Sequence, residues 1–337
     1  MITSAPRVSV VVPCYNSAWS VERTLRSILA QRMTEFELIV VNDGSTDDLH
    51  RRIEGFLSDR RVRVIDQDNR GLAGARNRGI AETRASLVAP LDADDLWHPD
   101  FLMETLDALD KFPSAPFAYA YSFRIDEQDH LLPIIPVKQP PRHDFLGLLS
   151  LNSVANGSAA VFRRALIEKF GGYDERLRAA EDWKLILQLA SLGTPALVER
   201  HLVGYRYVAT GMSQGNPRRQ CDAVLAVIAD LQKEFPKVSK HWFADARTMM
   251  TTCLLPAFLR HGLFGDVMRE TFHAYIRNPL WFRNATLRQA HLLRLRIIVR
   301  YLLGAMAGRA TSYPSLCCAE MEGTRPFAFM KRRWESI

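Results

Sequence analysis

The chain has 337 residues, with a formal net charge of +7, and 47% of its residues are hydrophobic. This length suffices for a large core plus an accessory region, and no internal repeat or low-complexity segment interrupts it. The five cysteines include no Cys-x-x-Cys pair, so neither a zinc ribbon nor a disulfide framework is indicated. No hydrophobic signal-like segment opens the chain, and we therefore expect a cytoplasmic protein.

The N-terminal part of the chain alternates apolar, β-branched runs with helical patterns. The predicted strands cover residues 7–13, 36–41, 62–65 and 86–91, and the predicted helices between them cover 21–33, 48–57 and 73–83. A strand, a helix and a second strand in succession imply a right-handed parallel unit. The predicted fold class is therefore α/β, with a Rossmann-like, mostly parallel sheet flanked by helices.

Three carboxylates, Asp92, Asp94 and Asp95, follow the last of these strands. Like charges so close together repel, and they are best tolerated where a divalent cation shares their oxygens. Such a cation, Mg²⁺ or Mn²⁺, often completes its coordination with substrate phosphates, so the cluster indicates a nucleotide or pyrophosphate ligand. A surface turn with solvated acids is the alternative interpretation. Tyr15 and Asp43 also follow predicted strands, and the carboxyl ends of parallel strands meet at one edge of a sheet.

A second acidic pair, Glu181 and Asp182, opens a helical pattern whose apolar face begins at Trp183. The helix dipole favours a charged carboxylate at this end. We therefore expect Asp182 to be ionised at neutral pH and able to take a proton from a substrate hydroxyl. A helix N-cap is the alternative interpretation of the same residue.

Four motifs, in their order and spacing, resemble the signatures of family 2 glycosyltransferases. They run from Val10 to Asn16, Val41 to Asp47, Asn69 to Asn77 and Leu91 to Asp95, within a likeness that covers roughly residues 8–213. The resemblance implies a GT-A fold, a nucleotide-sugar donor, a divalent metal and transfer with inversion at the anomeric carbon. The processive signature Gln-x-x-Arg-Trp is absent at the expected place, which favours transfer of one sugar per binding event.

The same resemblance assigns roles to single residues. It implies donor contacts for Pro13, Tyr15, Asp43, Arg76 and Asp92, metal binding by Asp94, the catalytic base at Asp182, and support from Glu181 and Arg206. From the residues alone, an Asx turn is the alternative for Asp43, and simple packing is the alternative for Tyr15. Arg70 and Arg78 are expected to be solvated helix charges.

Charge divides the chain near residue 217. Residues 1–216 carry 25 Lys and Arg against 28 Asp and Glu, whereas residues 217–337 carry 19 against 9, a net charge of +10. We therefore expect two parts, a GT-A nucleotide-sugar glycosyltransferase domain at 1–216 and a basic helical C-terminal region at 217–337. The helices predicted in that region cover residues 218–235, 241–262, 264–276 and 284–308.

The basic region has more than one interpretation. Arginines alternate with aliphatic residues in its last predicted helix, which argues for peripheral contact with an anionic membrane and against a transmembrane span. A helical bundle packed on the domain, or a homo-oligomer interface, is the alternative. Nucleic acid is not an expected partner, because aromatic residues are not interleaved with the basic ones.

The predicted function is transfer of a sugar from a nucleotide-diphosphate donor to a hydroxyl of a glycan or lipid-linked acceptor, in cell-surface polysaccharide synthesis. A sugar nucleotidyltransferase is the alternative enzyme. That class needs a glycine-rich, basic triphosphate loop directly after the first strand, where this chain has Pro-Cys-Tyr-Asn at residues 13–16. A nucleic-acid-binding protein acting through the basic region is the non-enzymatic alternative.

Overall fold

A computed structural model describes residues 5–132, 143–150, 152–154, 156–208 and 215–277, with residues 292, 295, 296, 298 and 299. Within these residues an eight-stranded sheet has the order β3-β2-β1-β4-β7-β6-β8-β5. The strands are β1 (Val8–Cys14), β2 (Phe36–Asp43), β3 (Val62–Gln67), β4 (Leu87–Pro90), β5 (Leu96–Trp97), β6 (Phe117–Ile125), β7 (Ala160–Arg163) and β8 (Ala196–Arg206).

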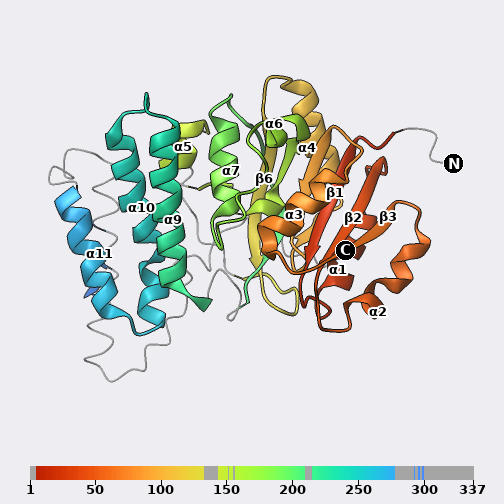
Figure 1. The fold of residues 1–337 in the computed structure, drawn as a ribbon, viewed down its shortest axis with the longest axis horizontal. Helices are drawn as coiled ribbons and strands as arrows, with labels where there is room; N and C mark the ends of the chain where they lie inside the picture. Colours follow the sequence, from red (N-terminus) through yellow and green to blue (C-terminus); the bar gives the residue numbers. More distant parts are fainter. Residues whose placement is uncertain are drawn as a thin grey trace.

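Helices cover the sheet and extend from one end of it (Figure 1). Those around the sheet are α1 (Val21–Leu29), α2 (Leu49–Ile53), the 3-10 turn η1 (Glu54–Ser58), α3 (Gly71–Ala81), α4 (Phe101–Lys111), α5 (Phe145–Ser150), η2 (Gly157–Ala159), α6 (Arg164–Lys169) and α7 (Glu181–Ala190). The C-terminal helices are α9 (Pro217–Glu234), α10 (Lys240–Arg260), which continues through Pro256, and α11 (Phe264–Arg277).

Every strand and helix predicted from the N-terminal pattern is present, with ends that differ by a few residues. The predicted helices at 218–235, 241–262 and 264–276 are confirmed as α9, α10 and α11. The helix predicted at 284–308 lies outside the described residues, apart from five isolated positions. The α/β class with a C-terminal helical region is confirmed.

The sheet has a parallel half and a mixed half. β3, β2, β1 and β4 are parallel neighbours, whereas β4 pairs antiparallel with β7, and β7 with β6. β1 and β2 are buried along their whole length, as expected for parallel strands covered on both faces. Gly79 lets α3 lie on these strands, because a Cβ there would be 2.3 Å from Cγ1 of Val11 and 3.1 Å from Cγ2 of Val41.

The C-terminal helices share the hydrophobic core of the sheet. Val227, Ile228 and Leu231 of α9 and Phe243 of α10 are fully buried in the same cluster as the sheet residues. α9 and α10 lie beside α7 and α5, and α11 lies at the far end (Figure 1). The division at residue 217 follows the charge of the sequence, whereas the buried core crosses it.

In the part of the chain that the structure describes, no helix is both long enough and apolar enough to cross a lipid bilayer.

Candidate functional site

Asp43, at the end of β2, holds the start of α3 in place. Its Oδ1 accepts hydrogen bonds from the backbone N–H of Arg70 (2.8 Å) and the side chain of Gln67 (2.7 Å), and its Oδ2 accepts from the N–H of Gly71 (2.8 Å). N–H groups in the first turn of a helix lack partners within the helix, and this carboxylate supplies one. The Asx-type bond in the loop comes instead from Asn42. A contact of Asp43 with a nucleobase stays a prediction.

The loop after β1 is bound to the loop after β2. The N–H of Thr46 donates to Oδ1 of Asn16 (2.8 Å), and the N–H of Asn16 donates to Oγ of Ser45 (3.1 Å). Pro13 is buried at the end of β1, whereas the ring of Tyr15 is 54% exposed. Simple packing therefore does not explain Tyr15, and its ring is free to stack on a planar ligand.

The carboxylates of the Asp92–Asp95 cluster have different surroundings. Asp95 is buried and accepts hydrogen bonds from Oγ of Ser158 (2.6 Å) and the backbone N–H of Arg206 (2.9 Å). The carboxylate of Asp94 has no side-chain partner within the described residues. Burial and the charge of Asp92 raise the pKa of Asp94 to about 6. One acid of the cluster is therefore fixed in the fold, and another is available to a ligand.

Arg206, at the end of β8, supports the backbone of this cluster. Its guanidinium is buried, donates from Nε to the carbonyl of Asp94 (2.6 Å) and from Nη1 to the carbonyl of Asp126 (2.5 Å), and pairs with Asp129 (2.5 Å). Its Cζ lies 5.9 Å from the ring centre of the half-exposed Trp19. Arg206 thus holds the backbone of Asp94 in place, and its support of the reaction stays a prediction.

Arg76 joins the two acidic clusters. Its guanidinium, on α3, donates from Nη2 to Oδ1 of Asp92 (2.6 Å) and from Nη1 to Oε1 of Glu181 (2.8 Å). The side chain is 2% exposed and lies 5.1 Å from the ring centre of Tyr173. A buried cation with two carboxylate partners and an aromatic face fixes the loop after β4 relative to the start of α7. Contact of Arg76 with a nucleotide stays a prediction.

Asp182 lies in the first turn of α7 without a side-chain partner in the described part of the chain. Its Oδ1 accepts a hydrogen bond from the N–H of Trp183 (2.7 Å), and the N-cap is Ala180, in a left-handed conformation with φ 59°. The N-cap interpretation of Asp182 is therefore wrong. Burial, followed by the neighbouring charge of Glu181, raises its pKa to about 7. The sequence predicts an Asp182 that is ionised at neutral pH; desolvation outweighs the helix dipole and brings its pKa into that range.

Three further residues shape this site, although none of them is among the residues predicted to form it. Gly157 permits a close approach, since a Cβ there would lie 3.2 Å from Nη2 of Arg76 and 3.4 Å from Cβ of Asp182. Ser158 bonds Asp95, and Tyr173 packs on Arg76. Glycine and serine are common in loops, so only the fold identifies these two as parts of the site.

The donor atoms of the site fit a divalent cation that is shared with a substrate. Within the described residues, no group of three or more His, Cys, Asp or Glu side chains could hold a metal ion without other ligands. Asp94 offers an unpartnered carboxylate beside Asp92, and carboxylate oxygens are ligands that Mg²⁺ and Mn²⁺ prefer. An ion held by so few protein groups needs further oxygen ligands from water or a bound phosphate.

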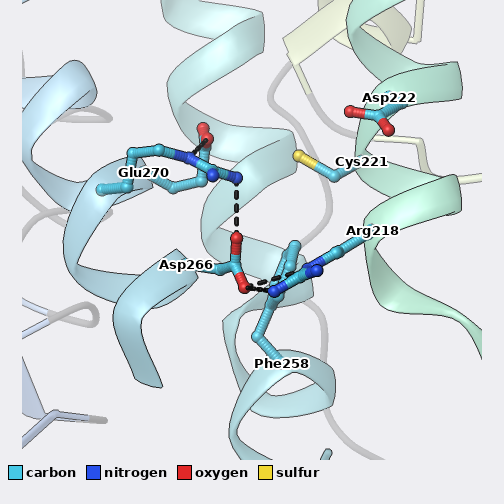
Figure 2. Close-up of a pocket in the computed structure, with 7 residues that line it drawn as sticks. Arg218, Cys221, Asp222, Phe258, Asp266 and Glu270 are labelled. Carbon is cyan, nitrogen blue, oxygen red and sulfur yellow. Dashed lines mark hydrogen bonds and ion pairs between the residues drawn. The ribbon is translucent and has the colours of Figure 1, made fainter. Parts of the chain in front are cut away.

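A cavity of about 170 Å³ between α9, α10 and α11 contains none of these residues (Figure 2). Asp266 lies at its centre and pairs with Arg218 (2.6 Å) and Arg269 (2.8 Å). Most of its charged side chains pair with one another, and the two acidic clusters at the sheet edge remain the candidate site.

Residues 9–171 match the family Glycosyl transferase family 2. Among curated relatives, chondroitin synthase of Escherichia coli is 34% identical over 128 residues, which are 38% of this chain and 19% of that protein. The chain spans about a third or less of the length of the first curated relatives it matches. Through residues 9–171 the chain belongs to the family 2 glycosyltransferases.

Solved structures of glycosyltransferases have the same fold. TarS 1–349 of S. aureus in complex with UDP-GlcNAc is 16% identical with a TM-score of 0.62, and the match covers 90% of this chain and 93% of that one. The mannosyltransferase PcManGT of Pyrobaculum calidifontis, in complex with GDP-Man and Mn²⁺, is 19% identical with a TM-score of 0.55, over 92% of this chain and 89% of that one. Both matches extend over the C-terminal helices, and at these identities they establish the fold alone.

Proposed function

We propose that this chain transfers a sugar, with inversion, from a nucleotide-diphosphate donor to a hydroxyl of a glycan or lipid-linked acceptor in cell-surface polysaccharide synthesis. The observation that carries this proposal is the bridge from Asp92 through Arg76 to Glu181. The bridge holds the loop of Asp94 and the helix of Asp182 around one guanidinium. Each of those two carboxylates lacks a side-chain partner within the described residues.

Asp94, with Asp92 beside it, would hold a divalent cation together with the donor diphosphate. When bound, such an ion supplies positive charge that stabilises a leaving diphosphate. Tyr15 supplies an exposed ring for the nucleobase, and the bonded loops after β1 and β2 fix the position of that ring. A preformed donor site reduces the entropic cost of binding.

Asp182 would remove the proton from the acceptor hydroxyl as that oxygen attacks the anomeric carbon. A general base acts best when its pKa lies near the working pH, and burial gives Asp182 a pKa of about 7. Attack from the face opposite the leaving diphosphate inverts the anomeric centre. The ion pair with Arg76 keeps Glu181 from sharing this role.

The comparisons support the class of substrate. TarS 1–349 has been solved with UDP-GlcNAc and PcManGT with GDP-Man and Mn²⁺, so this fold accommodates nucleotide-diphosphate sugars. Chondroitin synthase, a relative by sequence, is named for a glycan product. We infer that the acceptor of this chain is likewise a glycan or its lipid-linked precursor.

A screen of nucleotide-diphosphate sugars tests the proposal. We expect at least one UDP- or GDP-sugar to raise the melting temperature with Mn²⁺ or Mg²⁺ present, and to be hydrolysed slowly when no acceptor is added. Incubation with nucleoside triphosphates and sugar 1-phosphates is the parallel arm. Release of pyrophosphate in that arm, without any effect of nucleotide-diphosphate sugars, would instead establish a sugar nucleotidyltransferase.

We also propose peripheral contact with anionic membrane through the C-terminal helices. The outer face of α11 is apolar, with Met268, Phe272 and Ile276 exposed at successive turns. The region from residue 217 onward carries a net charge of +10. Apolar side chains on a basic surface bind anionic lipid by burial and charge together, with each basic residue near the surface contributing about 1 kcal/mol.

Point variants test this contact better than truncation, because the core crosses residue 217. We expect Phe272→Ser with Ile276→Ser to reduce co-sedimentation with anionic vesicles, and high salt to reduce it in the unmodified chain. Phe112→Ser, at a half-exposed site after α4, is the control. Equal recovery with neutral and anionic vesicles would reject membrane contact, and a concentration-dependent loss of dimer in the α11 variant would identify this face as a homo-oligomer interface.

A further inference from the structure

Beyond its first turn, helix α7 is apolar and buried except for two polar side chains. Lys184 is 7% exposed and Gln188 is 9% exposed, whereas the residues around them are hydrophobic. They lie four positions apart, so they stand one turn from each other on one side of the helix. A buried ammonium group is costly unless a carboxylate compensates it, so the partners of Lys184 are informative.

Helix α9 supplies matching partners at the same spacing. Nζ of Lys184 donates to Oδ2 of Asp230 (3.0 Å), and Nε2 of Gln188 donates to both carboxylate oxygens of Glu234 (3.0 Å each). The two acids also lie four positions apart on their own helix. Two successive turns of α7 are therefore paired in register with two successive turns of α9. The two helices lie side by side in Figure 1. Asp174 adds a second carboxylate to Lys184, at 2.7 Å.

This pairing determines how α7 is rotated about its own axis. A shift of one residue turns a helix by about 100° and moves it along its axis by about 1.5 Å. Such a shift would leave Lys184 without Asp230 and Gln188 without Glu234. Because Lys184 and Gln188 are buried, the loss of these partners would destabilise the fold. Asp182 is two residues before Lys184, so the same rotation sets the direction of its carboxylate.

We propose that α9, through Asp230 and Glu234, positions the proposed catalytic base, so that the C-terminal helices are part of the transfer machinery. This inference rests on the proposed function of Asp182. Asp230 and Glu234 are positioning residues, because they act through Lys184 and Gln188. The helices of residues 217–277 then serve the acceptor side of the reaction, independently of any membrane contact.

The segment before α7 connects the same pairing to the donor side. Asp174 contacts Lys184, and the backbone of the adjacent Tyr173 exchanges hydrogen bonds with the side chain of Asn77 on α3 (2.8 and 2.9 Å). The ring of Tyr173 lies against Arg76, which bonds both acidic clusters. α9, α7 and α3 thus form one bonded series that ends at the site.

The experiment compares Asp230→Asn and Asp230→Glu with the unmodified full chain, using the donor identified in the nucleotide-sugar screen. Transfer is expressed per donor-binding site, and the number of sites is measured by titration calorimetry at a temperature well below the melting point. We expect Asp230→Asn to lower kcat about 10-fold, since misplacement by about 1 Å can cost up to 100-fold, while the donor Kd changes less than about 2-fold. Asp230→Glu should restore part of kcat.

Asp222→Asn is the matched control, because it removes the same charge from an exposed position on α9 that makes no hydrogen bond or ion pair with α7 within the described residues. If Asp230→Asn does not fold, Glu234→Gln tests the same pairing from a more exposed position. A wild-type kcat per donor-binding site in the folded variant, or an equal loss in Asp222→Asn, would overturn the inference. An unmodified chain that transfers no sugar would instead contradict the proposed function.

Discussion

The two acidic clusters of the site are held in different ways. The cluster after β4 is fixed mainly by two residues of the sheet region. Oγ of Ser158 and the backbone N–H of Arg206 bond Asp95, and the guanidinium of Arg206 bonds the carbonyl of Asp94. The cluster at the start of α7 is fixed by Arg76, which also bonds Asp92 of the first cluster, and, further along the helix, by α9. In each case the bonds fall on neighbouring groups and leave one carboxylate without a side-chain partner in the described residues.

Both arrangements keep reactive carboxylates in a stable fold by bonding the residues beside them. Asp95 and Glu181 take the side-chain bonds, so Asp94 and Asp182 have no side-chain partner in the described residues and can meet a ligand. Both of the latter have a raised pKa, because burial disfavours their charged forms. We therefore expect substitutions of the acids without a side-chain partner and substitutions of their bonded neighbours to change different properties. Activity should respond at Asp94 and Asp182, and stability should respond at their bonded neighbours.

The largest effect is expected from Asp94→Asn. Loss of the unpartnered carboxylate removes the proposed metal ligand, so transfer should be lost, and nucleotide-diphosphate binding should no longer depend on Mn²⁺. Titration calorimetry of the nucleotide with and without Mn²⁺ measures this, and EDTA should produce the same loss in the unmodified chain. Asp107→Asn, at an exposed position of α4, is the charge control. Undiminished metal-dependent binding by Asp94→Asn would remove Asp94 from the metal site.

Asp182→Asn is expected to have the next largest effect. Removal of the base should lower kcat by about 10²-fold or more while leaving donor affinity nearly intact, because a general base contributes mainly in the transition state. Steady-state kinetics combined with donor titration separate these two quantities. A parallel loss of donor affinity, or a large drop in melting temperature, would mean that Asp182 contributes to binding or folding instead.

The pH dependence of transfer distinguishes the two clusters further. Asp182 must be ionised to accept a proton, and its pKa is about 7, so kcat should rise with pH and level off above that value. At pH 6 about one tenth of the base is ionised, which implies about a 10-fold lower rate than at the plateau. Glu181→Gln removes the neighbouring charge that raises this pKa, so the acid limb should move to lower pH. An acid limb that stays in place in the pH profile of that variant would show that another group controls it.

Much of the donor side could be predicted from the sequence, because its features are local. The strands and helices up to β4 follow short-range hydrophobic patterns, and the strand-end positions of Tyr15, Asp43 and Asp94 follow from them. The mixed half of the sheet could not be predicted in the same way. Its β4–β7 and β6–β7 pairs are antiparallel and join segments distant in sequence.

The bonds that assemble the site are also long-range, which explains why their roles were not evident. Arg76 and Glu181 are 105 positions apart, and Ser158 and Asp95 are 63 apart. The motif around Arg76 indicates that this residue is important, but it does not identify the carboxylates that Arg76 binds. The desolvation of Asp182 is not evident from the sequence for the same reason, since the distant loop of Gly157 lies against this residue.

The smallest effect on activity, and a clear effect on stability, is expected from Asp95→Ala. This substitution leaves Oγ of Ser158 and the backbone N–H of Arg206 without their partner in a buried place. Unsatisfied buried donors cost about 1–3 kcal/mol each, so the free energy of unfolding should fall by about that amount or somewhat more. Donor affinity should change little in the folded fraction, because Arg206 still holds the carbonyl of Asp94. Urea denaturation measures the stability, with Asp107→Ala as the exposed control. If Asp95→Ala kept its stability and lost transfer, Asp95 would belong with Asp94 among the ligand-binding acids, and the division of roles within this cluster would be wrong.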